Sequence, residues 1–239
     1  MKIKYEKLHR FCEEIFQKYG FNREDSFVIA DVLVQADLFG VESHGVSRIL
    51  KYIDLLEQNV IQLDAELEIV KEIELSAVLD AHSAMGQIAA VKAMQTAIKK
   101  AKQHGIGMVQ LRNSNHYGIA GYYALLAAKE HMLGVSMTNS PAIMVPTFCA
   151  EALLGSNPIA FAMPAGKYPF LYDGATTVIT RGKVELYQKT GKQLMDGWTV
   201  DETGKNEVRP DIILKDIREK RGGGILPVGG SGELQAGYK

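Results

Sequence analysis

Apolar residues recur at helical spacing along the first quarter of the chain. Residues 5–19 carry them on one side and are followed by Gly20 as a helix stop. A second helix is predicted over 25–38. A third is predicted to start near Ser43, a residue type that caps helix N-termini. The pattern therefore indicates an N-terminal helical region, and we place its end at residue 75.

Beyond that point short apolar runs alternate with helical segments. The pattern predicts strands at 67–70, 77–80, 106–111, 133–137, 159–163 and 170–172, and helices at 87–103 and 119–131. Such alternation is typical of an α/β sheet. Residues 191–210 are polar and rich in turn formers, and the glycine-rich stretch 222–239 ends without a predicted helix or strand. We therefore expect two regions, a helical 1–75 and an α/β 76–239.

Composition narrows the function classes. The 239 residues have a formal net charge of −1 and no long basic run, so nucleic acid is not expected as the main partner. The two cysteines, Cys12 and Cys149, form no CxxC pair, which fits a reducing cytoplasm and argues against a zinc site. The N-terminus lacks the apolar core of a secretory signal, and no apolar run is long enough for a bilayer. We expect a cytoplasmic protein with no membrane partner.

The segment 40–48, GVESHGVSR, holds the most suggestive side chains. His44 and Arg48 stand four residues apart, and on a helix this spacing places them on one face with Tyr52. Ser43 and Gly45 flank the histidine at the expected helix start, where backbone N–H groups favour anions. Arginine can hold a carboxylate with two hydrogen bonds. The alternative is a surface helix whose arginine pairs with an acidic side chain.

A second histidine lies in the loop NSNHYG, between a predicted strand and a predicted helix. Loops at the carboxyl ends of strands are where α/β folds bind their ligands. His116 in such a loop could act as an acid or base near neutral pH. The alternative is a turn held by asparagine and serine caps. Two histidines, one arginine and no metal-ligand cluster indicate acid–base chemistry on a small organic acid.

Three further turns contain small and hydroxyl-bearing residues that let a ligand approach the backbone. They are 139–141 (NSP), 155–158 (GSNP) and 172–177 (YDGATT). Taken singly, each also reads as an ordinary turn or cap. The end of the chain fails the P-loop pattern because Tyr238 stands where its lysine belongs, and no GxGxxG follows a strand.

The ordered set of motifs is more specific than any one of them. ESHGVSR, LDAHSAMGQ, NSNHYGIAGYY, TNSPAIMVP, LGSNPIAFAMP, DGATT, a GW followed by DETG, and LPVGG with GYK occur in that order. From about residue 5 to the end, this set resembles the malate/L-lactate dehydrogenase family of NAD(P)-dependent oxidoreductases. The resemblance implies the L-sulfolactate dehydrogenase-like fold, which has a mixed sheet and is not a Rossmann fold. Relatives in that family include ureidoglycolate, sulfolactate and diketogulonate dehydrogenases or reductases.

The resemblance also implies roles for individual residues. Ser43, His44 and Arg48 correspond to active-site residues, and His116 corresponds to the second active-site histidine. Asp173 corresponds to an acid that supports the histidine and lies beside the cofactor. The implied cofactor contacts are Ser140, Asp173, Gly174, Ala175, Thr176 and Lys239. Family members continue well beyond the GYK motif, so we expect a truncated chain whose homodimer forms only with the C-terminal part present.

These inferences predict reversible hydride transfer between NAD(P)H and a small 2-oxo acid. Arg48 would hold the substrate carboxylate. One of His44 and His116 would give the proton while the other orients the carbonyl, and Asp173 would favour the imidazolium form of its partner. The sequence leaves open which histidine is the acid, which oxo acid reacts, and whether the cofactor is NAD or NADP. The alternative function is an inactive fragment that only binds a ligand or a partner chain.

Overall fold

The computed structural model describes residues 3–229, which form two compact units. Unit 1 contains the chain up to Ser136 together with Phe161–Leu171. Unit 2 contains Met137–Ala160 and the chain from Tyr172 onward. The predicted division into a helical region 1–75 and an α/β region 76–239 is not tested by these compact units and stays a prediction.

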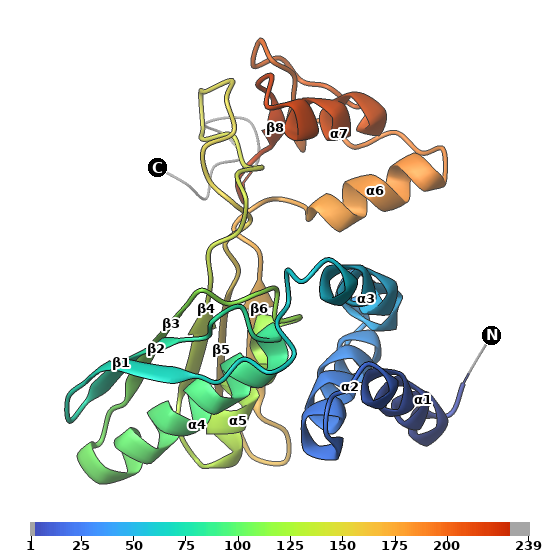
Figure 1. The fold of residues 1–239 in the computed structure, drawn as a ribbon. Helices are drawn as coiled ribbons and strands as arrows, with labels where there is room; N and C mark the ends of the chain where they lie inside the picture. Colours follow the sequence, from blue (N-terminus) through green and yellow to red (C-terminus); the bar gives the residue numbers. More distant parts are fainter. Residues whose placement is uncertain (1–2, 230–239) are drawn as a thin grey trace. The chain divides into compact units, whose positions relative to one another are not determined.

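The helices of unit 1 begin with α1 (Tyr5–Lys18) and α2 (Arg23–Leu38), which pack against each other. Asn22 caps α2 by accepting a hydrogen bond from the backbone N–H of Asp25 at 2.8 Å. The short helix α3 (Ile49–Glu57) adds Tyr52 to the same apolar core. Figure 1 shows these helices together. The first two predicted helices are confirmed.

The first sheet of unit 1 contains β1 (Glu68–Glu72), β2 (Ser76–Asp80) and β3 (Met108–Arg112) in that order. Strands β1 and β2 are antiparallel, whereas β2 and β3 are parallel and are joined through α4 (Gly86–His104). Helix α4 ends at Gly105, whose left-handed backbone closes it. Helix α5 (Ala120–Lys129) follows β3 and packs on α4. The β2–α4–β3 crossover brings the carboxyl ends of two strands to one edge.

The remaining elements lie at the unit boundary or in unit 2. Strands β4 (Gly134–Met137), β5 (Ile159–Met163) and β6 (Phe170–Gly174) form a sheet in that order, and each strand spans the boundary between the units. Unit 2 has helices α6 (Arg181–Lys189) and α7 (Pro210–Glu219) and a pair of two-residue strands, β7 (Thr199–Val200) and β8 (Gly224–Ile225). Its core includes the fully buried side chains of Val184, Ile213 and Ile225. The predicted mixed α/β fold is confirmed.

Two sequence-based predictions are wrong in detail. No α-helix starts at Ser43, because two 3₁₀ turns precede α3 and the helix begins only at Ile49. Residues 191–210, predicted as turns, contain β7. The glycine-rich stretch that begins at residue 222 contains β8, which pairs with β7. Two-residue strands leave no periodic pattern in a sequence, so neither could be found from apolar spacing.

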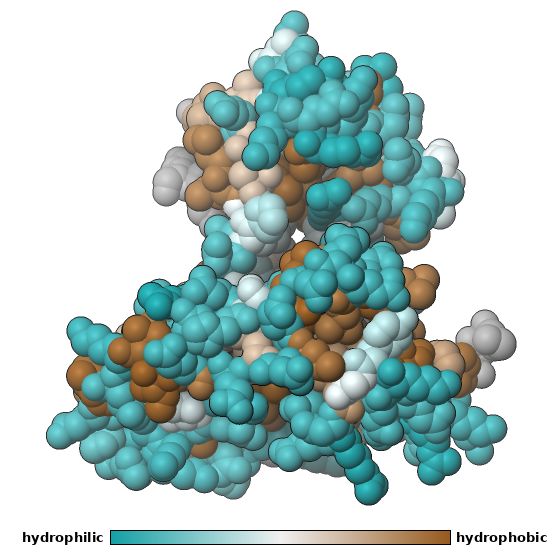
Figure 2. Space-filling view, in the orientation of Figure 1, coloured by the Kyte–Doolittle hydropathy of each residue, from teal (hydrophilic) through white to brown (hydrophobic). Residues whose placement is uncertain are grey.

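Exposed apolar side chains gather at one end of the first sheet. They are Ile73 and Leu75 in the β1–β2 hairpin, Ile106 just before β3, and Met108 at its start. Figure 2 shows hydrophobic surface over this part of unit 1.

Among the described residues, no helix has the length and hydropathy to cross a bilayer.

Candidate functional site

The segment that carries His44 and Arg48 is held by a carboxylate of α2. It forms two 3₁₀ turns, η1 (Glu42–His44) and η2 (Val46–Arg48), separated by Gly45. Asp37 accepts a hydrogen bond from the backbone N–H of Val46 at 3.0 Å. A Cβ on Gly45 would lie 1.8 Å from Asp37 Oδ1, so only glycine allows this approach. The GVESHG sequence therefore encodes an anchored double turn.

This geometry corrects the reason given for pairing His44 with Arg48. Gly45 has an extended backbone, so the two residues do not share an α-helical face. The two residues are nevertheless near each other, because the Arg48 side chain folds back onto the backbone of Ser43, the residue before His44. Arg48 ends η2 and caps α3, and its Nε donates to the backbone oxygen of Ser43 at 2.5 Å.

The two predicted histidines meet in unit 1. The rings of His44 and His116 stack with centroids 5.4 Å apart and planes inclined by 26°. Ser43 Oγ lies 2.9 Å from His44 Nδ1, and Tyr52 Oη lies 2.7 Å from His116 Nδ1. Sequence-distant residues of the η1 turn, α3 and the loop after β3 are thus assembled into one cluster, with Arg48 beside it.

The loop that carries His116 is fixed at the carboxyl ends of β2 and β3. Asp80, at the end of β2, accepts hydrogen bonds from Arg112 Nε at 2.9 Å and from Asn113 Nδ2 at 2.7 Å. Asn115 Nδ2 donates to the backbone oxygens of Ser83 at 2.8 Å and Ala84 at 3.1 Å. The asparagines of NSNHYG are therefore structural, and they hold the histidine at the edge where ligands bind in α/β folds.

Both histidines are neutral near pH 7 in this environment. Burial, and then the Arg48 charge, lowers the pKa of His44 to about 4. His116 keeps an exposed side and packs its other side against His44 and Tyr52. Loss of hydration on the packed side, followed by the neighbouring His44 ring and Arg48 guanidinium, lowers the pKa of His116 to about 3. Neutral imidazoles can each donate from one ring nitrogen and accept at the other.

In unit 2 the structure joins the three polar turns singled out in the sequence. Ser140 Oγ accepts from the backbone N–H of Ser156 at 2.9 Å, and Ser140 N–H donates to Asn157 Oδ1 at 3.0 Å. Thr176 donates to the Ser156 backbone oxygen through its N–H at 2.8 Å and its hydroxyl at 3.0 Å. A Cβ on Gly155 would lie 2.3 Å from the backbone oxygen of Ser140. NSP, GSNP and DGATT therefore form one compact cluster of hydroxyls and backbone groups.

The remaining predicted cofactor contacts lie next to this cluster or outside the described residues. Asp173 and Gly174 are the last residues of β6, and Asp173 is exposed in unit 2. Ala175 connects them to Thr176 and is partly buried. Lys239 lies outside the described residues. The proposed support of a histidine by Asp173 stays a prediction.

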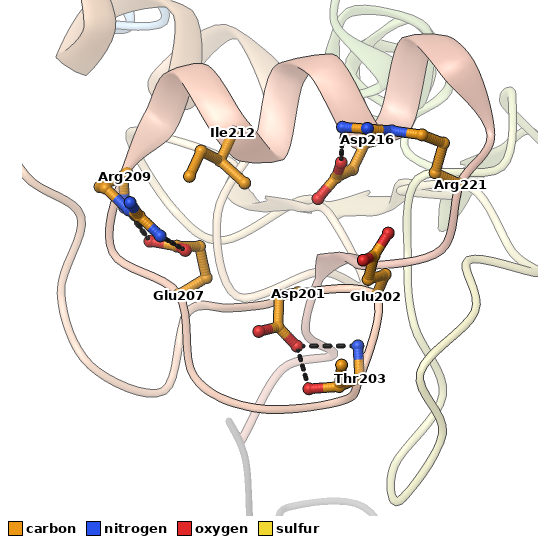
Figure 3. A pocket seen from close by; sticks show the side chains of 8 residues that line it. All are labelled: Asp201, Glu202, Thr203, Glu207, Arg209, Ile212, Asp216 and Arg221. Atoms are coloured by element: carbon orange, nitrogen blue, oxygen red, sulfur yellow. Dashed lines mark hydrogen bonds and ion pairs between the residues drawn. The ribbon is translucent and has the colours of Figure 1, made fainter.

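Unit 2 also has a polar pocket, and its two arginines form ion pairs with carboxylates of the same pocket (Figure 3). Arg209 grips Glu207 through Nε at 2.9 Å and Nη2 at 2.6 Å, and Arg221 Nη2 lies 2.7 Å from Asp216. Asp201 accepts from the backbone N–H and hydroxyl of Thr203, which closes the DETG turn. These charges are paired with one another, which indicates a structural role for this pocket.

Sequence reasoning missed several residues of the unit 1 cluster. The sequence pattern gives Tyr52 no role of its own, and Asp37 carries no signal because a lone acid in a helix is common. Gly86 and Gln87 belong to the LDAHSAMGQ motif. A Cβ on Gly86 would lie 2.4 Å from the backbone oxygen of His116, so the start of α4 directly contacts the histidine loop. The Gly–Gln pair opening a helix after a strand was the available signal.

Comparison with known proteins identifies the family to which this chain belongs. The malate/L-lactate dehydrogenase family matches residues 3–239, and the chain belongs to that family. A malate dehydrogenase from Pyrococcus abyssi is 44% identical over 240 residues, covering 100% of this chain and 64% of the relative. An L-sulfolactate dehydrogenase from Methanocaldococcus jannaschii is 40% identical over 230 residues, covering 96% of this chain and 65% of the relative.

The fold agrees with a solved relative. The crystal structure of a malate dehydrogenase from Entamoeba histolytica matches with a TM-score of 0.95 at 34% identity, covering 100% of this chain and 66% of that one. The chain thus spans a little under two thirds of the length of the curated relatives it matches.

Proposed function

We propose that the protein is an oxidoreductase that interconverts a small 2-oxo acid and its 2-hydroxy acid with a nicotinamide cofactor. The observation that carries this proposal is the cluster of His44, His116 and Tyr52 beside Arg48. It combines a fixed cation with neutral imidazoles at the carboxyl edge of a parallel strand pair. Membership of the dehydrogenase family supports the same reaction class.

Arg48 is the proposed carboxylate anchor. Its Nε donates a hydrogen bond to the backbone oxygen of Ser43, and this bond fixes the plane of the guanidinium. The remaining N–H groups then point away from Ser43. A planar guanidinium fixes both the charge and the orientation of a bound carboxylate. If Arg48 holds the oxo acid by its carboxylate, the adjacent carbonyl stays at a constant distance from the histidines. Holding reacting groups in a fixed geometry contributes a large part of enzymatic rate enhancement.

A histidine of the cluster is proposed to donate a hydrogen bond to the carbonyl oxygen and, after taking up a proton from solvent, to give a proton to the developing alkoxide. Tyr52 Oη and, more weakly, the backbone N–H of Gly118 at 3.4 Å point at His116 Nδ1. Because the Gly118 N–H donates to Nδ1, the tautomer with hydrogen on Nε2 is favoured. The exposed side of His116 leaves a path to a ligand. His44, oriented by Ser43, would then hold the carbonyl from the other side. Such a positioned donor is typically worth about 10²–10⁴-fold in rate.

The residues of unit 2 fit a nicotinamide cofactor. Ser140, Ser156 and Thr176 bring hydroxyl and amide groups together, and Gly155 permits close backbone approach. Such groups suit the ribose and phosphate oxygens of a dinucleotide. When bound, the reduced cofactor supplies a hydride to the carbonyl carbon. We propose Ser140 and the 173–176 turn as contacts, with Lys239 as a further one.

The proposal extends to the substrate, the type of cofactor, the oligomeric state and the location in the cell. Relatives are named malate and L-sulfolactate dehydrogenases, which supports a four-carbon dicarboxylate or a sulfonated analogue as substrate. One relative from Escherichia coli is named ureidoglycolate dehydrogenase (NAD(+)), which supports NAD over NADP. We retain a homodimer and a cytoplasmic location as proposals from the sequence.

Titration of the chain with NADH and with NADPH, followed by nicotinamide fluorescence, tests cofactor binding first. Oxidation of the bound cofactor on adding oxaloacetate, sulfopyruvate or pyruvate then tests turnover. We expect binding of at least one cofactor and turnover with at least one oxo acid. Binding without turnover on any acid would favour a ligand-binding fragment, and failure of both would refute the proposal.

A further inference from the structure

We propose that Tyr123 is a positioning residue for His116 and acts through the peptide group that joins Tyr117 to Gly118. The inference rests on the proposed function, because it gives His116 a working orientation as a donor. Tyr123 lies in the first turn of α5 and is only 1% exposed. It therefore acts on a ligand only through other groups.

Tyr123 holds the residue that follows His116. Its hydroxyl donates a hydrogen bond to the backbone oxygen of Tyr117. The two tyrosine rings also stack, with centroids 4.8 Å apart and planes inclined by 4°. Burial raises the pKa of the Tyr123 hydroxyl well above its ordinary value, so the group keeps its proton and remains a donor. The Tyr117 oxygen is thus fixed in its direction by a buried side chain of α5.

The same peptide group carries the N–H that faces His116. In a planar trans peptide the C=O and the N–H point in opposite directions. The C=O of Tyr117 points to Tyr123, and the N–H of Gly118 donates to His116 Nδ1 at 3.4 Å. Because the peptide is rigid, the hydroxyl that holds its oxygen also aims its N–H at the imidazole.

Without that hydroxyl, the peptide could turn over. Gly118 has a φ of +83°, and glycine adopts positive and negative φ with similar ease. The two commonest β-turn types differ by such a rotation of one peptide plane, while the path of the chain changes little. The hydrogen bond from Tyr123 therefore selects one of two accessible orientations.

The orientation of this peptide decides the tautomer of His116. When the Gly118 N–H faces the ring, Nδ1 must accept, and the ring carries its hydrogen on Nε2. In the opposite orientation the Tyr117 oxygen would face Nδ1 and favour hydrogen there. The Tyr52 hydroxyl, 2.7 Å from Nδ1, can donate or accept and fits both tautomers. The choice therefore depends on the peptide that Tyr123 holds.

The test is the tautomer of His116 in the intact chain, read by long-range ¹H–¹⁵N correlation of the histidine rings. The signals of His116 are assigned by their loss in His116→Gln. We expect the Nε2–H form in the parent and a mixture of both tautomers in Tyr123→Phe, which keeps the ring and loses the hydroxyl. The matched control is Tyr122→Phe. Tyr122 is the neighbouring tyrosine of α5, but its hydroxyl donates to Asp31 at 2.8 Å, so this variant should keep the parent's tautomer.

Three results would overturn the inference. One is a pure Nε2–H form in folded Tyr123→Phe, and another is an Nδ1–H form in the parent. The third is an equal change of tautomer in Tyr122→Phe, which would show a general loosening of α5. The spectrum requires no turnover, so these results stand whether or not the chain is active, and they separate the inference from the proposed function.

A second variant decides the point if Tyr123→Phe does not fold. Gly118→Ala disfavours the positive φ and should turn the peptide over, which gives the Nδ1–H form. Its Cβ would lie 2.6 Å from Val32 Cγ1, so the substitution is made in a Val32→Ala background. Val32→Ala alone should keep the parent's tautomer. A pure Nε2–H form in the double variant would refute the link between the peptide and His116.

Steady-state kinetics distinguishes positioning from substrate binding. In Tyr123→Phe we expect kcat for the oxo acid to fall in proportion to the fraction of His116 that has lost the Nε2–H form. The KM should stay within about twofold of the parent's, because Tyr123 does not touch the substrate. A raised KM with an unchanged kcat would place Tyr123 in substrate binding and refute the inference.

Discussion

At the scale of single residues, one carboxylate holds the turns that carry His44 and Arg48. Asp37 reaches from α2 to the backbone of Val46 and occupies the space that a side chain at residue 45 would need. Burial raises the pKa of this carboxyl, and the hydrogen bond from Val46 opposes the effect. The positions of His44 and Arg48 thus depend on Gly45 and on Asp37.

We predict that Gly45→Ala lowers the free energy of unfolding by about 1–3 kcal/mol, the usual cost of forcing an added methyl group into a packed site. Urea denaturation measures it. Adding Asp37→Ala removes the colliding carboxylate, so the double variant should be less destabilised than the sum of the two single variants. Strict additivity would show that the alanine at position 45 is accommodated without touching Asp37.

We predict that Arg48→Lys raises the KM for the oxo acid about tenfold or more while the chain stays folded. An ammonium cannot reproduce the fork of a guanidinium, and one charge-assisted hydrogen bond is worth about 1.5–3 kcal/mol. Steady-state kinetics on parent and variant would show the change. Lys51→Arg, on the next turn, is the control, and an unchanged KM in Arg48→Lys would remove this residue from carboxylate binding.

The histidine pair also predicts how stability depends on pH. The pKa of His44 falls from its ordinary value of 6.5 to about 4 in the folded chain, so folding favours the neutral ring. The associated stability is complete above pH 6.5 and is lost as the pH falls from 6.5 toward 4, where the unfolded chain takes up the proton. His44→Gln should therefore flatten the fall of the melting temperature across this window. The exposed His104→Gln is the control, and parallel curves for His44→Gln and parent would contradict the linkage.

At the scale of elements, the sequence specified most of the fold but not the conformation of the site. Helices α1, α2, α4 and α5 follow apolar periodicity over several turns, and their predicted bounds agree with the structure within a few residues. The helix expected from Ser43 failed because a capping signal is local, whereas the carboxylate of Asp37 that produces the 3₁₀ turns comes from another element. His44 and His116 were found by type, but their stacking depends on contacts that no spacing encodes.

The contact between α4 and the His116 loop gives a prediction at this scale. Gly86→Ala should separate the helix from the loop, because its Cβ would meet two backbone oxygens that have no freedom to rotate away. We expect a loss of about 1–3 kcal/mol in the free energy of unfolding and, in the histidine spectrum, a shifted His116 signal. Gly105→Ala in the same helix has open space around its Cβ but a left-handed backbone, so it should cost stability without moving His116. An unshifted His116 in Gly86→Ala would refute the coupling.

At the scale of the whole molecule, the apolar end of the first sheet and the proposed site lie at opposite ends of the same two strands. His116 follows the carboxyl end of β3, whereas Leu75 and Met108 stand at the amino ends of β2 and β3 and are joined there by a backbone hydrogen bond. The apolar side chains at the amino ends of β2 and β3 can therefore be substituted without contact to the His116 loop.

We predict that the chain associates with increasing concentration, because soluble proteins rarely expose clustered large apolar side chains without burying them on another surface. The cluster is Ile73, Leu75, Ile106 and Met108, of which Ile106 is 62% and Met108 66% exposed. Light scattering across a concentration series should show mass above 26.3 kDa for the parent and a lower mass for Met108→Lys. Because this substitution lies at the far end of β3, it should leave the His116 spectrum and cofactor titration unchanged. A parent that stays at the mass of one chain at all concentrations would show that these side chains are tolerated in water, and equal masses for parent and Met108→Lys would place the association on another surface.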